Sequence, residues 1–188
     1  LSVFQWLTAD IQISENILHL HGLIPTLLNA MMNDHDLLFK QKAISILSNL
    51  ACHSKNQQQM CLYYQLVQKL ITVIHDCKNV ELIKRAMRVV YNLSLTMRHE
   101  LLKLDLRLME TVKNAINAQD ESVKTWAILT WINICDEKTN ELNVTSDMLT
   151  RIKRILREET EEWTIKHGLK AFLMLSITNE NRRTNNIQ

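Results

Sequence analysis

Four segments of this chain can be aligned with one another, and they recur at nearly constant intervals. They are AISILSNLA at 43–51, AMRVVYNLS at 86–94, AILTWINIC at 127–135 and GLKAFLMLS at 168–176. A shortened fifth copy, LSVFQWLT, occupies 1–8. The alignment brings five apolar residues into register at steps of 43, 43, 41 and 41 residues, namely Leu7, Leu50, Leu93, Ile134 and Leu175. A period of this length is typical of stacked helical units that contact only their neighbours, rather than of one central core.

The shortage of helix breakers predicts that each unit is built from helices. The 188 residues include two glycines and one proline, which leaves little room for the turns of a sheet protein. We expect third helices near 1–8, 37–53, 80–96, 121–137 and 161–177, second helices near 23–32, 65–75, 105–117 and 148–158, and first helices near 14–21, 57–64, 99–104 and 140–145. Ser14 is expected to cap the earliest first helix and Gly22 to end it. Without a linker to divide it, 1–188 is predicted to be one domain of about four and a half units from a longer protein.

A stripe of apolar residues runs along every third helix. Relative to Asn49 and its counterparts, the positions five before, two before and one after are apolar in all four full units, and the position six before is Ala or Gly. Residues three or four apart share one face of a helix. The stripe therefore predicts that the third helices pack side by side, with Leu93 and Trp131 among the core residues.

These residues resemble the armadillo repeat of β-catenin and importin-α. The segment Gly22-Leu23-Ile24-Pro25-Thr26-Leu27-Leu28 is similar to the start of the second helix in that family. The strings from Ala43 to Leu50, Ala86 to Leu93 and Ala127 to Ile134 are similar to its third helix. The resemblance covers nearly the whole chain. It implies an all-α, right-handed α-solenoid whose third helices line a concave groove, and a non-enzymatic adaptor or scaffold that binds another protein.

The resemblance also implies a row of peptide-binding amides. In the family an Asn on each third helix bonds the backbone of an extended peptide, and here that position is occupied by Asn49, Asn92 and Asn133. An Asn amide both donates and accepts, so it can hold a peptide unit without reading its side chain. The alternative is that each Asn ties its own helix to the neighbouring repeat or faces water. Trp6 and Met174 depart from the pattern, because they stand where Asn is expected.

Basic residues gather on the flank that carries the Asn position. The slots four, seven and eight before it hold no acidic residue and six basic ones, although the whole chain has 22 basic and 20 acidic residues. A surface of one sign attracts the opposite charge. We therefore predict a groove for an extended acidic or phosphorylated peptide, unless these charges only solvate the surface. The groove residues would be the three Asn together with Ser45, Lys42, Lys84, Arg85, Arg88, Trp126, Leu129, Lys166 and Lys170.

Two other functions compete with peptide binding. The basic side chains, Lys84 and Arg88 among them, could bind nucleic acid, although the net charge of +2 argues against it. Alternatively, apolar residues at the chain start, such as Phe4 and Trp6, could mediate self-association. A second basic cluster at 151–157 is interpreted as a solvated surface beside the acidic run 158–162.

Neither catalytic nor metal chemistry is indicated by the sequence. None of the seven histidines is followed by a second histidine four residues later, and the four cysteines show no metal-ligand spacing. No catalytic motif or membrane span is recognisable. We expect no cofactor, and a location in the cytoplasm or the nucleus, where thiols stay reduced.

Overall fold

The structure, a computed structural model, describes residues 8, 10–20, 22–33 and 36–134, together with 150, 152–154, 157, 165 and 169. Between residues 8 and 134 the described chain forms nine helices, and none of the described residues lies in a strand. The first helices of three units are α2 (Ile11–Leu18), α5 (Ser54–Leu62) and α8 (Arg98–Leu104). The second helices are α3 (Leu23–Asn33), α6 (Tyr64–Asp76) and α9 (Leu108–Ile116), and the third are α4 (Leu37–Ala51), α7 (Val80–Ser94) and α10 (Glu121–Ile134). The third helices predicted at 1–8 and 161–177 lie almost wholly outside the described residues.

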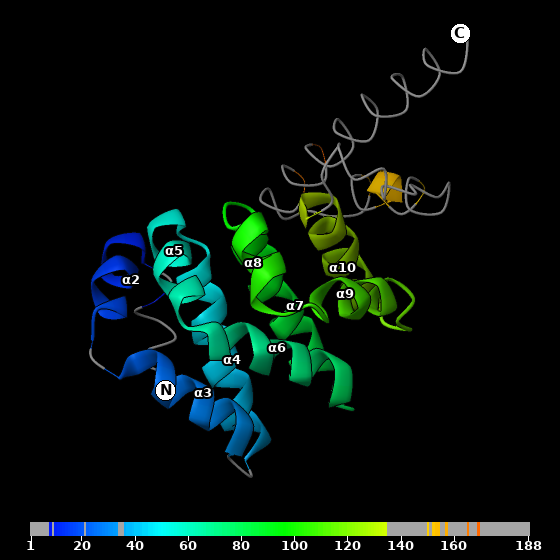
Figure 1. The fold of residues 1–188 in the computed structure, drawn as a ribbon. Helices are drawn as coiled ribbons and strands as arrows, with labels where there is room; N and C mark the ends of the chain where they lie inside the picture. Colours follow the sequence, from blue (N-terminus) through cyan, green and yellow to red (C-terminus); the bar gives the residue numbers. More distant parts are fainter. Residues whose placement is uncertain are drawn as a thin grey trace, which may run out of the picture.

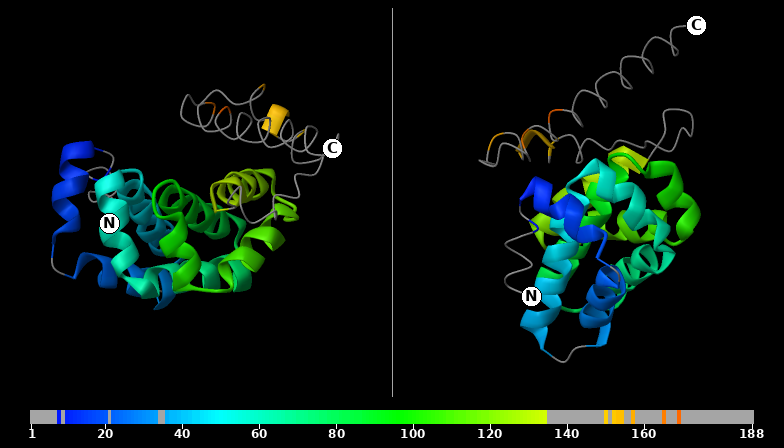
Figure 2. Two further views of the ribbon diagram at one scale, coloured as in Figure 1. Left: turned by 45° about the horizontal axis from the view of Figure 1, so that its top comes forward. Right: turned by 90° about the vertical axis from the view of Figure 1, so that its left-hand side faces the viewer.

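The helices form three rows rather than a bundle around one centre. In Figure 1 the first, second and third helices each follow one another across the molecule in chain order, and the left view of Figure 2 shows the same succession from another side. Helix α7 packs between α4 and α10, and each second helix packs on the third helix of its own unit. Each unit is thus covered by its neighbours, which is the arrangement of an α-solenoid.

The apolar stripe of the third helices is the core of this stack. The small residues Ala43, Ala86 and Ala127 are completely buried, so adjacent third helices approach closely at these positions. Leu93, in the middle of the described array, is also completely buried. Trp131 was predicted to lie in the core as well, but it is only partly buried against it.

Each third helix begins at a side chain that caps its free N–H groups. Asp36 Oδ1 accepts a hydrogen bond from Leu38 N at 2.8 Å at the start of α4. Asn79 does the same for α7, and Asp120 for α10. Caps of this kind typically contribute about 1 kcal/mol each. They fix the starts of the three helices at the positions that the sequence predicts.

Two first helices begin three residues earlier than predicted. Helix α2 starts at Ile11 and is capped by Asp10, whose Oδ1 accepts from Ile13 N at 3.1 Å. Ser14 does not cap it; instead it is buried, and its Oγ accepts from Asn56 Nδ2 at 3.2 Å. Helix α5 starts at Ser54 and so includes Asn56 and Gln57, which are both buried. Their side chains donate to the last carbonyls of α4, Asn56 to Leu50 O at 3.1 Å and Gln57 to Ala51 O at 2.8 Å.

Gly22 was predicted to end the first helix, but α2 already ends at Leu18 with His19 as its C-cap, so Gly22 lies in the turn that leads to α3. Its φ of 81° is the left-handed conformation that glycine adopts without strain. The chain can therefore reverse from α2 into α3, and Pro25 falls in the first turn of α3, where its missing N–H has no helical partner to lose.

Candidate functional site

Helix α7 carries three of the cations that the sequence singles out, Lys84, Arg85 and Arg88. Lys84 and Arg85 are each about a third exposed, at 36% and 33% of their side chains. Both pair with Glu81, through Lys84 Nζ to Oε2 at 2.8 Å and Arg85 Nη2 to Oε1 at 2.7 Å. The hydrogen bond from Lys84, and then the charge of Arg85, lower the pKa of Glu81. The prediction of a flank without acidic residues missed this carboxylate, although its spacing of three and four residues to the two cations was a visible signal.

Arg85 reaches across to the preceding unit. Its Nη1 donates to Oγ of Ser45 on α4, and Ser45 in turn donates to Gln41 O at 2.8 Å. Nε of Arg85 is buried and has no hydrogen-bond acceptor among the described residues. The guanidinium is therefore held between α4 and α7, although its Nε–H group makes no hydrogen bond to a described residue. Ser45 itself is buried, so it positions Arg85 rather than offering a free surface.

Arg88 lies on an aromatic pair. Its Cζ is 5.7 Å from the centroid of the Trp126 ring on α10, and Trp126 in turn lies 5.3 Å from the ring of Tyr91 at an interplanar angle of 48°. The contact with Trp126 is a cation–π interaction, which restricts the guanidinium without neutralising it. Burial raises the pKa of Tyr91 well above its usual range, with a hydrogen bond to Asn133 opposing the shift.

Trp126 and Leu129 were predicted to line the groove, but the structure buries both of them. Trp126 is 9% exposed and Leu129 is 1% exposed. Leu129 stands at the same position of its helix as Arg88 and Ser45, at the edge of the buried stripe. Only a long side chain at this position can bring a charge to the surface, because its stem spans the apolar edge. Lys42 on α4 is half-buried, and Lys166 and Lys170 lie outside the described residues.

The three Asn side chains all donate to the unit before them. Asn49 Nδ2 donates to Thr8 Oγ1 at 3.3 Å, Asn92 Nδ2 to Ser48 O at 3.2 Å, and Asn133 Nδ2 to Ser94 Oγ at 3.0 Å. In this structure the amides therefore act as ties between neighbouring repeats. Asn92 is completely buried, whereas Asn49 and Asn133 are half-buried. A peptide could reach the latter two more easily than Asn92.

Replacement of Asn92 by Ala is expected to lower the free energy of unfolding by about 1–3 kcal/mol. The change removes the donor to Ser48 O and leaves that buried carbonyl oxygen without the bond from Asn92. Part of the loss is offset because Asn92 Oδ1 is itself buried without a donor among the described residues. Chemical denaturation measures the change, with Asn114→Ala as the control on the exposed face of α9. Equal stability of the two variants would show that the tie contributes nothing.

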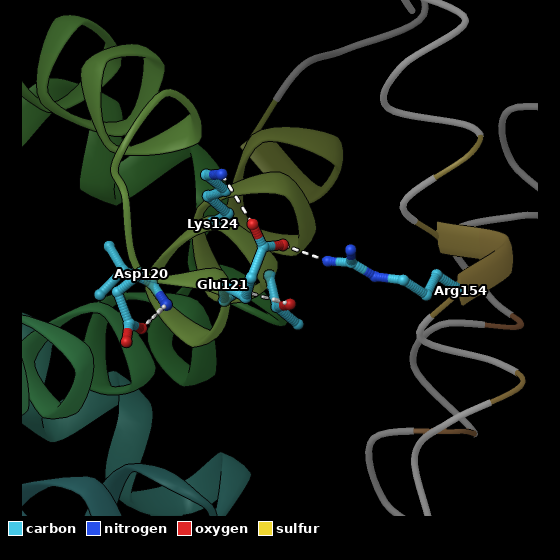
Figure 3. A network of polar contacts seen from close by, with 6 residues as sticks. Asp120, Glu121, Lys124 and Arg154 are labelled. Atoms are coloured by element: carbon cyan, nitrogen blue, oxygen red, sulfur yellow. Dashed lines mark hydrogen bonds and ion pairs between the residues drawn. The ribbon is translucent and has the colours of Figure 1, made fainter.

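The second basic cluster is anchored to the array by an ion pair (Figure 3). Arg154 Nη2 pairs with Glu121 Oε2 at the start of α10, and Lys124 Nζ lies 2.7 Å from the other oxygen of the same carboxylate. The hydrogen bond from Lys124 and, to a lesser extent, the one from Arg154 lower the pKa of the Glu121 carboxyl to about 2. The sequence suggested the acidic run 158–162 as the neutralising partner of this cluster; that run lies outside the described residues, and Glu121 is the partner that the structure shows for Arg154.

Among the described residues, no three His, Cys, Asp or Glu side chains are grouped so that they could hold a metal ion. In the same part of the chain, none of the helices combines the length and the apolar character that crossing a bilayer requires.

Comparison with known proteins identifies the fold. Neither the protein-family models nor the curated proteins match the chain. A designed armadillo repeat protein, YIII(Dq)4CqI, matches with a TM-score of 0.66 over 92% of this chain and 72% of its own, at 16% identity. Computationally designed armadillo repeat proteins for modular peptide recognition match with a TM-score of 0.65 over 90% of this chain and 72% of theirs, at 17% sequence identity. A designed armadillo repeat protein in complex with peptide (KR)4 matches with a TM-score of 0.62 over 90% of this chain and 72% of its own, at 16% sequence identity. The predicted armadillo-type solenoid is thereby confirmed.

Proposed function

We propose that this chain is a non-catalytic protein-interaction module, and that its row of third helices binds an extended acidic or phosphorylated peptide of another protein. The observation that carries the proposal is the distribution of charge on α4, α7 and α10. The half-buried cations Lys42, Lys84, Arg85 and Arg88 lie along α4 and α7. The carboxylates of these three helices are Glu81 and Glu121, and both stand in the first turn of their helix.

The arrangement of the cations suits an anionic ligand better than it suits solvation alone. A solvated surface needs no restraint, and Lys and Arg on such a surface lose side-chain entropy when they are ordered. Here Arg85 is held by Glu81 and Ser45, and Arg88 by Trp126. Because the guanidiniums are already restrained, a carboxylate or phosphate that binds them has less ordering cost to overcome.

The likeness to a designed protein in complex with peptide (KR)4 supports the mode of binding and not the charge of the ligand. That complex shows that an armadillo-repeat protein can hold a short peptide. Its peptide is basic, whereas the third-helix surface of this chain carries an excess of basic side chains. Charge complementarity therefore favours a peptide of the opposite sign here.

Peptides of equal length that differ in charge test the proposal. An aspartate-rich peptide, its phosphoserine analogue and a lysine-rich peptide, each carrying a fluorophore, are titrated with the protein and followed by fluorescence anisotropy. We expect the two anionic peptides to bind, with an affinity that falls as salt is raised, and the lysine-rich peptide not to bind. Tighter binding of the lysine-rich peptide, or of single-stranded DNA of matching length and charge, would contradict the proposal.

A further inference from the structure

A hollow of about 450 Å³ lies in the row of second helices, where α3 meets the corner between α5 and α6. Leu28 of α3 is the buried part of its lining. Around it stand the exposed apolar groups of Pro25, Leu62 and Tyr63, and Lys69 of α6 adds a cation. The hollow thus combines an apolar lining with a few polar groups, the composition that ligand sites generally have.

The apolar residues at this corner are exposed because the backbone leaves them no alternative. Helix α5 ends at Leu62 and α6 begins at Tyr64, so Tyr63 alone joins the two helices. With so short a connection, neither side chain turns into the core; Leu62 is 81% exposed and Tyr63 is 42% exposed. Leu62 therefore contributes little to folding through burial. Together with the exposed Pro25 and Tyr63 it forms an apolar patch over Leu28, and a patch of this kind can mark an interaction site.

Lys69 is available for an ion pair with a ligand. It is half-buried, and within the part of the chain that the structure describes no carboxylate pairs with it. The repeat pattern does not dictate a cation here, because aligning α9 on α6 through Leu108 and Val67 places Glu110 at the corresponding position. The positive charge is thus a property of this hollow and not of the repeat.

We propose that the hollow binds an extended segment of a partner protein through one large apolar side chain, which packs over Leu28 against Leu62, and an adjacent carboxylate, which pairs with Lys69. Burial of the apolar side chain over Leu28 supplies most of the attraction. The exposed ion pair adds less. One such contact is weak by itself, so the site serves as an additional anchor, separate from the third-helix surface and independent of it.

Two short capped peptides test the proposal, acetyl-Leu-Asp-amide and its neutral twin acetyl-Leu-Asn-amide. Both are titrated into ¹⁵N-labelled protein, and amide chemical shifts are followed by NMR. We expect shifts centred on the backbone of residues 62–69, and an affinity for the Asp peptide about twofold to fivefold higher than for the Asn peptide. Lys69→Gln is expected to remove that preference. Lys113→Gln, on the exposed face of α9, is the matched control and is expected to retain it.

Leu62→Ala separates the apolar contact from the charge. The side chain is exposed, so the variant is expected to fold as the native chain does and to bind both peptides more weakly. Equal affinities of the native protein for the two peptides would overturn the proposal, as would shifts centred on α7 instead of the α5–α6 corner. Sedimentation at several concentrations tests whether a second copy of the chain occupies the hollow instead. If Leu62→Ala abolished self-association and left the peptide affinities unchanged, a second copy would be the occupant and the proposal would be wrong.

Discussion

The Leu93→Ala variant is expected to lose about 2–5 kcal/mol of its free energy of unfolding. Leu93 is completely buried in α7, the third helix that packs against α4 on one side and α10 on the other. Truncation removes apolar contacts and leaves a cavity that close-packed neighbours cannot fill. Stabilities of single domains are of the same order as this loss, so a large part of the array is expected to unfold at physiological temperature.

The effect should extend beyond the helix that carries the substitution. In a stacked array each unit is stabilised by the interface with its neighbours. Hydrogen exchange of the variant is therefore expected to show lower protection of α4 and α10 as well as α7. Leu106→Ala is the matched control, because it is the same substitution at a side chain that is 91% exposed. It should change stability by less than about 0.5 kcal/mol. If the two variants were equally stable, the side-by-side packing of third helices would not be what holds the array together.

The fold could be predicted from the sequence because its determinants are local and repeated. A small residue followed by apolar residues at helical spacing recurs at Ala43, Ala86 and Ala127, and all three are completely buried. What could not be predicted depends on partners about forty residues away. Ser14 has the chemistry of a helix cap, but Asn56 of the next unit binds it. No pattern within either helix reveals such a contact.

The candidate site shows a similar limit. Helical spacing predicted that Lys84, Arg85 and Arg88 share one flank, since residues three and four apart share a face, and the structure leaves all three half-buried. Spacing could not give the depth of each side chain. Trp126 and Leu129 lie on the same flank but face the core, where Trp126 supports Arg88 from below. The depth depends on how neighbouring helices pack, which the pattern of one helix does not contain.

The double reversal Arg85→Glu with Arg88→Glu is expected to weaken binding of the aspartate-rich peptide by about tenfold to a hundredfold. Each substitution replaces an attraction with a repulsion at a half-buried position, and hydrogen bonds to charged groups contribute about 1.5–3 kcal/mol. The remaining affinity should also depend less on salt, because fewer opposite charges meet. Arg85→Gln with Arg88→Gln gives the intermediate case, in which the attraction is removed and no negative side chain is added.

Two controls decide whether a loss of binding comes from the third-helix surface itself. Lys103→Glu with Lys113→Glu alters the net charge by the same amount, at exposed positions of α8 and α9, and is expected to leave the affinity nearly unchanged. Thermal denaturation of every variant checks the fold, because Arg85 also bonds Ser45 of the preceding unit and its loss is expected to lower the melting temperature slightly. If both double reversals weakened binding equally, the net charge of the protein would govern the interaction, and α7 would have no special part in it. If the arginine reversal left affinity and salt dependence as they are in the native chain, the peptide would bind elsewhere, and the charge on the third helices would serve solvation alone.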